Sequence, residues 1–137
     1  MSVIVTDKGF GPETWTGAFD TAETISAETA ALDVASDQDP LPLLAAAPLL
    51  AMIRVDFPSF ADGRGFTLAR RLRLAGYKGR LRARGHVIAD QYAMARRSGF
   101  DEVEISEELA ARQPEGDWVF RADWQAHDYQ SRLRASA

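Results

Sequence analysis

The sequence contains no cysteine among its 137 residues and has two histidines. The absence of cysteine excludes disulfide bonds, thiolate zinc sites, cysteine-ligated iron–sulfur clusters and a cysteine nucleophile. Two histidines leave little scope for an all-histidine metal site, so we expect no metal site. Because the sequence also lacks a P-loop, a nucleophile elbow and a complete dinucleotide fingerprint, no cofactor is evident. We therefore expect the isolated chain to transfer no electrons on its own.

Long apolar runs are also lacking. The longest run, residues 41–53, has 13 residues and is interrupted by Pro42 and Pro48. A membrane-spanning helix needs about 20 apolar residues, so this run is too short to cross a bilayer. The first ten residues have no basic stretch ahead of an apolar one, and we expect no signal peptide. These features favour a cytoplasmic protein with no membrane segment.

The net charge of −4 conceals a segregation of charge along the chain. Residues 1–61 carry a net charge of −7, residues 62–99 of +8 and residues 100–137 of −5. In one interpretation the basic middle and the acidic flanks neutralise each other within one fold. In the other, a basic face meets an anion, an acidic partner or a nucleic acid. The acidic character of the whole chain disfavours nucleic acid.

Predicted strands and helices alternate from about residue 30. The expected strands are 31–35, 51–57, 79–84 and 103–105, and the expected helices are 43–50, 64–75, 87–98 and 107–112. This alternation predicts a small α/β domain of βα units with a mostly parallel sheet, either a half-barrel or an open three-layer sandwich. We expect one domain over residues 1–137, with a poorly patterned segment at 1–29 and an aromatic tail at 113–137.

In parallel α/β folds, functional sites collect at the carboxyl ends of the strands. The predicted strands bring Asp56, Arg64, Arg84, His86 and Asp90 to such a rim. Carboxylates and a histidine can exchange protons with a substrate, so the candidate catalytic residues are Asp56, His86 and Asp90. In the alternative interpretation these side chains cap helices and fix loops.

The run Asp62-Gly63-Arg64-Gly65 directly precedes a predicted helix. Glycines allow backbone N–H groups to approach an anion, the helix start carries partial positive charge, and a guanidinium donates two parallel hydrogen bonds. Alternatively, the run is a turn in which Arg64 pairs with Asp62 or Asp56. The candidate anion-binding residues are Asp62, Gly63, Arg64, Gly65, Arg82 and Arg84.

Four sequence blocks, in this order and spacing, resemble a bacterial family of small proteins of unknown function. The blocks are Asp56 to Phe66 (DFPSFADGRGF), Gly76 to Ala83 (GYKGRLRA), Asp90-Gln91 and Ser98 to Asp101. Genes of this family often neighbour that of the sulfite reductase haemoprotein, and its members are commonly labelled probable oxidoreductases of sulfite reduction. The resemblance covers roughly residues 50–106.

The resemblance implies a role in assimilatory sulfate reduction, with sulfite reductase as a partner. We expect an accessory protein that binds this enzyme or a small anion (sulfite, sulfate or phosphate) near Arg64. One alternative is a small enzyme that uses the rim around Asp56, Arg64 and His86. Another is a structural subunit whose basic face docks on an acidic partner. The sequence also leaves a homodimer open.

Overall fold

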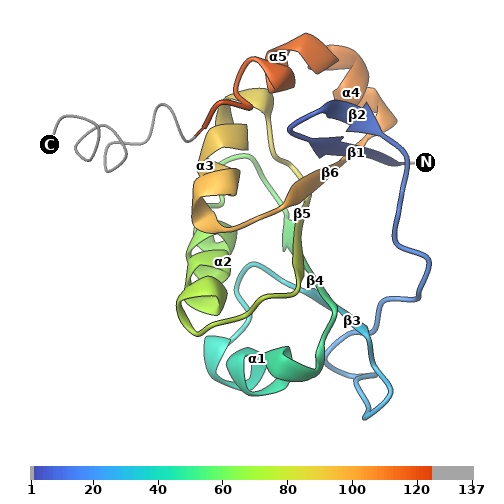
Figure 1. Ribbon diagram of the computed structural model, residues 1–137, viewed down its shortest axis with the longest axis vertical. Helices are drawn as coiled ribbons and strands as arrows, with labels where there is room; N and C mark the ends of the chain where they lie inside the picture. Colours follow the sequence, from blue (N-terminus) through green and yellow to red (C-terminus); the bar gives the residue numbers. More distant parts are fainter. Residues whose placement is uncertain (1, 125–137) are drawn as a thin grey trace, which may run out of the picture.

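The computed structural model describes residues 2–124, which form one six-stranded sheet with helices beside it (Figure 1). The strands are β1 (Ser2–Thr6), β2 (Gly9–Gly11), β3 (Ala31–Val34), β4 (Met52–Phe57), β5 (Arg80–Gly85) and β6 (Glu102–Ser106). Their order across the sheet is β2-β1-β6-β5-β4-β3. Strands β3 to β6 are parallel neighbours, whereas β1 pairs antiparallel with β6 and with β2. The predicted α/β fold with a mostly parallel sheet is confirmed.

The helices lie on one face of this sheet. They are α1 (Pro40–Ala46), α2 (Arg64–Leu74), α3 (Tyr92–Ser98), α4 (Glu107–Arg112), α5 (Glu115–Val119) and two 3₁₀ turns, η1 (Ala47–Leu49) and η2 (Ala89–Gln91). Because β3 to β6 follow one another in chain order, right-handed crossovers place every connecting helix on the same side. Figure 1 shows α1, α2 and α3 together on that side. In the described residues α1, α2 and α3 therefore form one layer against the sheet.

Two predicted helices have different boundaries in the structure. Helix α1 begins at Pro40, not at Leu43, because the Asp39 carboxylate accepts the backbone N–H of Leu41 at 3.0 Å and proline is well tolerated in a first helical turn. It ends at Ala46, ahead of the turn that contains Pro48. The helix expected at 87–98 begins at Tyr92, and a 3₁₀ turn precedes it.

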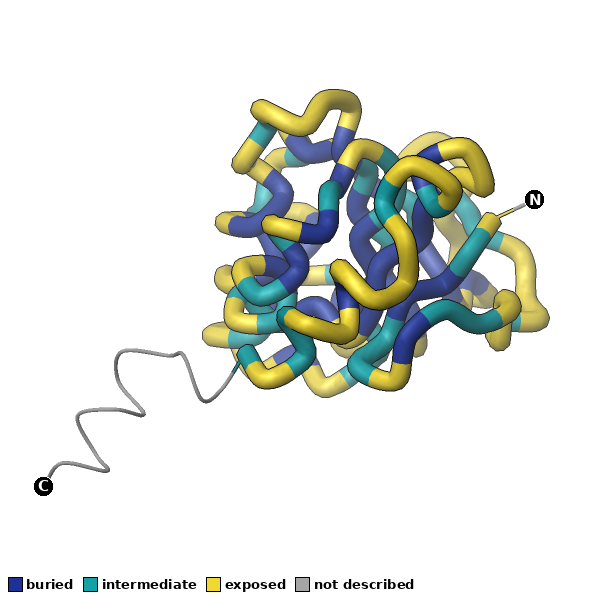
Figure 2. Tube along the Cα trace, turned by 90° about the horizontal axis from the view of Figure 1, so that it is seen from above, coloured by how far each residue is buried: buried dark blue, intermediate teal, exposed yellow. Residues whose placement is uncertain are grey.

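The hydrophobic core lies between the sheet and the helices. Alternate residues of β4, namely Ile53, Val55 and Phe57, point toward the helices and are buried. Leu72 of α2 packs in the same cluster. Burial of one such side chain contributes about 1.5–3 kcal/mol. Figure 2 shows the buried parts of the chain gathered inside, with exposed loops around them.

The aromatic side chains of the predicted tail lie in different environments. Trp118 of α5 is fully buried, and its indole N–H donates to the carbonyl oxygen of Gln113 at 2.9 Å. Phe120, two residues further on, is largely exposed. Tyr129 lies outside the described residues. Trp118 therefore belongs to the core.

The opposite face of the sheet is crossed by the segment between β2 and β3. Figure 1 shows this segment, in blue, running along the side away from the helices. At its end Asp20 pairs with the outer edge of β3: its N–H donates to the Ala31 carbonyl at 2.9 Å, and its carbonyl accepts the N–H of Asp33 at 2.8 Å. The poorly patterned N-terminal segment thus contacts both the face and the edge of the sheet.

Candidate functional site

The sheet face away from the helices carries charged side chains on four strands, and we call it the charged face. Its members are Asp33, Arg54, Asp56, Arg80, Arg82, Arg84, Glu102 and Glu104. The strand register aligns Asp33, Arg54, Arg82 and Glu102 in one row across β3 to β6. A second row aligns Asp56, Arg84 and Glu104. Opposite charges meet in register in most of these pairs, which stabilises a sheet, whereas Arg54 and Arg82 are like charges side by side.

Arg82 lies at the centre of this face, and its side chain is 0% exposed. Its guanidinium donates to Glu102 at 2.6 Å and to Glu104 at 2.8 Å. The carboxylate of Glu13, in the segment after β2, accepts two further hydrogen bonds from Arg82 at 2.6 and 2.7 Å. Burial disfavours the charge on Arg82, but the hydrogen bonds to Glu13, Glu104 and Glu102 and the charge of Glu102 together outweigh burial and raise the pKa of Arg82. Arg82, predicted to bind an anion, is occupied by three carboxylates.

Arg54 is held beside Arg82 in a similar way. It donates two hydrogen bonds to Asp33, at 2.5 and 2.7 Å, and a third to Glu104 at 3.0 Å. The ring of Phe19 covers its guanidinium at 3.7 Å. Glu104 thus bridges two neighbouring arginines, which offsets their mutual repulsion.

Asp56 and Arg84 lie at the carboxyl ends of their strands, as predicted. Their nearest charged atoms are 3.6 Å apart, and both side chains are partly exposed. Together with Ser2 and Ser106 they line an open hollow of about 410 Å³. Gly85, at this end of β5, has φ of +108°, and a Cβ there would come within 2.8 Å of the Phe57 carbonyl oxygen. A larger residue in place of Gly85 would therefore displace the backbone that lines the hollow.

His86 and Asp90 do not line the hollow that contains Asp56 and Arg84. The Nδ1 atom of His86 lies 3.1 Å from the Phe57 carbonyl oxygen, and its ring meets that of Phe60 edge-on. Asp90 pairs with Arg121 at 2.7 Å. The structure therefore separates the three candidate catalytic residues into different environments.

Asp62 and Arg64 pair with each other at the start of α2. The Asp62 carboxylate accepts from Nε and Nη2 of Arg64, at 3.0 and 2.8 Å, and from the Ser36 hydroxyl at 2.7 Å. The Arg64 and Ser36 hydrogen bonds hold the pKa of the Asp62 carboxyl well below its usual range. Gly65 has a packing role, since a Cβ there would come within 2.5 Å of the Phe57 ring. This is the paired turn that the sequence left as an alternative to an anion site.

Arg64 nevertheless borders a second open hollow, of about 400 Å³. Thr67 and Arg71 follow it along the same side of α2, and the loop from Ser36 to Pro40 forms the other wall. Within residues 2–124 the Arg71 guanidinium has no ion-pair or hydrogen-bond partner. We call this site the Arg64–Arg71 hollow. Its positive charge comes chiefly from Arg71, because Asp62 neutralises Arg64.

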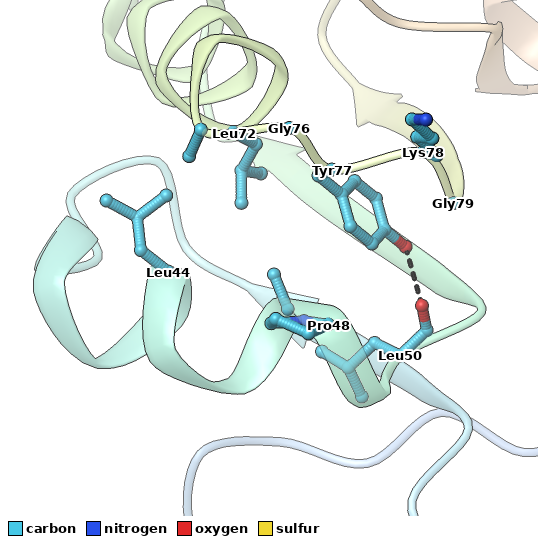
Figure 3. A pocket seen from close by; sticks show the side chains of 10 residues that line it. Leu44, Pro48, Leu50, Leu72, Gly76, Tyr77, Lys78 and Gly79 are labelled. Carbon is cyan, nitrogen blue, oxygen red and sulfur yellow. Dashed lines mark hydrogen bonds between the residues drawn. The ribbon is translucent and has the colours of Figure 1, made fainter.

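A third hollow, of about 280 Å³, lies between α1, η1 and the end of α2 (Figure 3). Its lining includes Leu44, Leu72 and Pro48, and the hydroxyl of Tyr77 donates to the Leu50 carbonyl at 3.1 Å. Burial raises the pKa of Tyr77 to about 12. The Tyr77 hydroxyl already has a partner, so this hollow presents a mainly apolar surface without a cluster of polar groups for a charged ligand.

Sequence reasoning missed Glu13, Arg54 and Arg71 as members of these sites. A signal for the charged face is present in the alternation of strand residues: arginines at 80, 82 and 84 have the same phase as glutamates at 102 and 104. No comparable periodicity identifies Glu13, which lies in irregular backbone. Across the described part of the chain, no group of three acidic or histidine side chains is placed to hold a metal ion. No helix there is long and apolar enough to cross a membrane.

These features define a small α/β protein whose sheet has helices on one face and paired charges on the other. The chain belongs to the DUF934 family of bacterial proteins of unknown function, whose family model matches residues 31–136. Comparisons with curated proteins and with solved structures give no significant match. Strands β1 and β2 and the segment carrying Glu13 lie ahead of the matched region.

Proposed function

We propose that this protein is an accessory protein of assimilatory sulfite reduction that binds a small oxyanion in the Arg64–Arg71 hollow. The observation that carries the binding site is the Arg71 guanidinium, which has no partner among residues 2–124 and lies two helical turns after Arg64 in the same hollow. Nε and Nη2 of Arg64 bond to Asp62, so we assign ligand binding to Nη1. The pathway in this proposal rests on the resemblance of the blocks at 56–66 and 76–83.

The chemistry of the hollow suits sulfite, sulfate or phosphate. Arginine side chains donate paired hydrogen bonds to such anions, and Thr67 adds a hydroxyl between the two arginines. The first turn of α2 adds partial positive charge. Asp37, on the opposite wall, opposes a highly charged ligand and thereby favours anions of low charge.

The test is thermal unfolding in sulfite, sulfate or phosphate against chloride at equal ionic strength. An anion at 100 times its dissociation constant stabilises the folded protein by about 2.7 kcal/mol. Arg71→Ala or Arg64→Ala should remove most of this effect. Arg70→Ala is the matched control, because it removes the same charge from the next residue, which does not line the hollow. An equal loss in the Arg70 variant, or no response of the native protein, rejects the site.

The outer surface of α2 and α3 supports docking on an acidic partner. Arg70 and Arg97 are exposed there, together with Leu74 at 81% and Met94 at 52% exposure. Cations around exposed apolar side chains fit a partner surface with the complementary pattern, and sulfite reductase is the partner we propose. It should be recovered by pull-down from sulfate-grown cells, less so at about 0.5 M salt and less so with Arg70→Glu and Arg97→Glu. Recovery unaffected by these substitutions would place the interface elsewhere.

A small enzyme is the second candidate, favoured by the partly exposed Asp56 and Arg84 across one hollow. In this case Asp56 would exchange a proton while Arg84 stabilises negative charge. NAD(P)H oxidation and absorption spectra of the purified protein test for redox activity. Any turnover should be lost in Asp56→Asn and retained in Asp90→Asn, because Asp90 does not line this hollow.

A further inference from the structure

Three arginines of the charged face lie beneath one short stretch of irregular backbone. Residues 12–19 contain no helix or strand and cross this face (Figure 1). Within this stretch Glu13 binds Arg82, the Thr14 hydroxyl accepts from Arg80, and Phe19 covers Arg54. The stretch therefore covers the charges of the sheet without belonging to it.

The partners of Arg82 differ in origin and in exposure. Glu102 and Glu104 lie on the neighbouring strand β6 and are buried, whereas the Glu13 side chain is 40% exposed. The two oxygens of Glu13 accept from Nη1 and Nη2 of Arg82, at 2.6 and 2.7 Å. Two parallel hydrogen bonds from one guanidinium are also how arginine binds carboxylate and phosphate ligands. Glu13 thus occupies the position that a ligand would take on Arg82.

The net charge of the face is the same with Glu13 or with a monoanion on Arg82. The charged face contains four arginines and four acidic residues, so it is neutral before Glu13 is added. Glu13 supplies one extra negative charge. A singly charged oxyanion with two free oxygens would therefore replace Glu13 without changing the net charge of the face.

Residues 12–19 also include a buried hydrogen-bond donor. The indole N–H of Trp15, two residues after Glu13, is buried and has no hydrogen-bond partner in the described part of the chain. A buried donor without a partner destabilises the closed state, and water would satisfy it once the segment lifts. This cost lowers the free energy needed to expose Arg82.

We propose that Arg82 is the floor of a second oxyanion-binding site, which Glu13 fills in the closed protein. A small monoanion that presents two oxygens, such as a carboxylate, binds Arg82 when residues 12–19 move away. No covalent bond is made or broken in the exchange. The site uses residues distinct from the Arg64–Arg71 hollow and does not depend on the proposed function.

The test uses formate as the probe and chloride at equal ionic strength as the reference. Glu13→Ala removes the internal competitor, so formate should raise its melting temperature saturably. The native protein should need at least a tenfold higher formate concentration for the same response. Glu28→Ala is the matched control, since Glu28 is an exposed glutamate of the same N-terminal segment, and it should behave as the native protein does. Equal effects of formate and chloride on Glu13→Ala would overturn the proposal.

Two further measurements apply if Glu13→Ala does not fold. Glu13→Gln retains the size and one acceptor oxygen, and it should respond to formate in the same saturable way. In the native protein the backbone N–H of Trp15 donates to Glu13 at 2.7 Å. Amides in residues 12–19 should therefore exchange hydrogen faster at the higher formate concentrations that raise the melting temperature of the native protein. Unchanged exchange would contradict the proposal. The double variant Glu13→Gln/Arg71→Ala should retain the formate response of Glu13→Gln, which separates this site from the Arg64–Arg71 hollow.

Discussion

The two faces of the sheet are built from the same strands but are held by different forces. On β4, Ile53 and Val55 enter the apolar core, while Arg54 between them forms ion pairs on the other face. An apolar contact accepts any side chain of suitable size, whereas a buried ion pair requires its own partner. The polar half of an alternating strand is therefore not always its solvent side. The polar side chains of a strand are buried where a neighbouring strand carries side chains of opposite charge.

The largest expected effect comes from breaking the charged face at its centre. Arg82→Met removes the cation that Glu102, Glu104 and Glu13 share and leaves Glu102 only Arg80 and Glu104 only Arg54, which should destabilise the protein by about 4 kcal/mol. Urea unfolding measures this change. Arg70→Met, on the exposed side of α2, should alter stability by less than about 0.5 kcal/mol. An Arg82→Met protein as stable as the native one would show that the ion pairs of the charged face contribute less to stability than the apolar core does.

A smaller effect is expected on the apolar face. Leu72→Ala creates a cavity beneath α2 and should cost about 3 kcal/mol in urea unfolding. Leu72 and Arg82 lie on opposite faces and share no partner. Their effects should therefore add to within about 0.5 kcal/mol in the double variant. A larger departure from additivity would mean that the two faces are energetically coupled through the sheet.

The smallest effect concerns acid stability. The hydrogen bonds from Arg82 lower the pKa of Glu13 from 4.5 to about 2 in the folded protein. The stabilisation from ionised Glu13 is therefore complete above pH 4.5 and is lost as the pH falls toward 2. Melting temperatures between pH 2 and 7 should fall less steeply in Glu13→Gln than in the native protein. Glu28→Gln should match the native slope, and a native slope in Glu13→Gln would mean that this ion pair contributes little.

The sequence predicted most of the helix-covered face because that face follows simple periodicities. The alternation in residues 51–57 and the apolar stripe of residues 66–75 both report burial directly. The boundary errors at α1 and α3 arose from side-chain hydrogen bonds of Asp39 and Gln91, which periodicity does not register. Side-chain hydrogen bonds near the starts of α1 and α3 therefore set these boundaries.

The candidate site was less predictable because its contacts join distant parts of the chain. The expectation that the carboxyl ends of parallel strands share one edge of the sheet correctly placed Asp56 and Arg84 together. It did not show that Arg82, two residues earlier, would be enclosed by Glu13, which lies 69 residues away in sequence. The segregated charge pattern allowed such pairing but did not specify the partners. For Arg82, which pairs with Glu13, Glu102 and Glu104, the interpretation in which the fold neutralises itself is the one that the structure supports.

The pairing of Asp20 with β3 has a consequence for how the protein behaves in concentrated solution. An open edge strand offers unpaired N–H and C=O groups to other molecules and promotes aggregation. Asp20 occupies two of these groups on β3, at Ala31 and Asp33. A chain shortened to residues 31–137 would lose this protection, together with the strands that cover β6. It should therefore self-associate on size-exclusion chromatography, while the full chain at the same concentration does not.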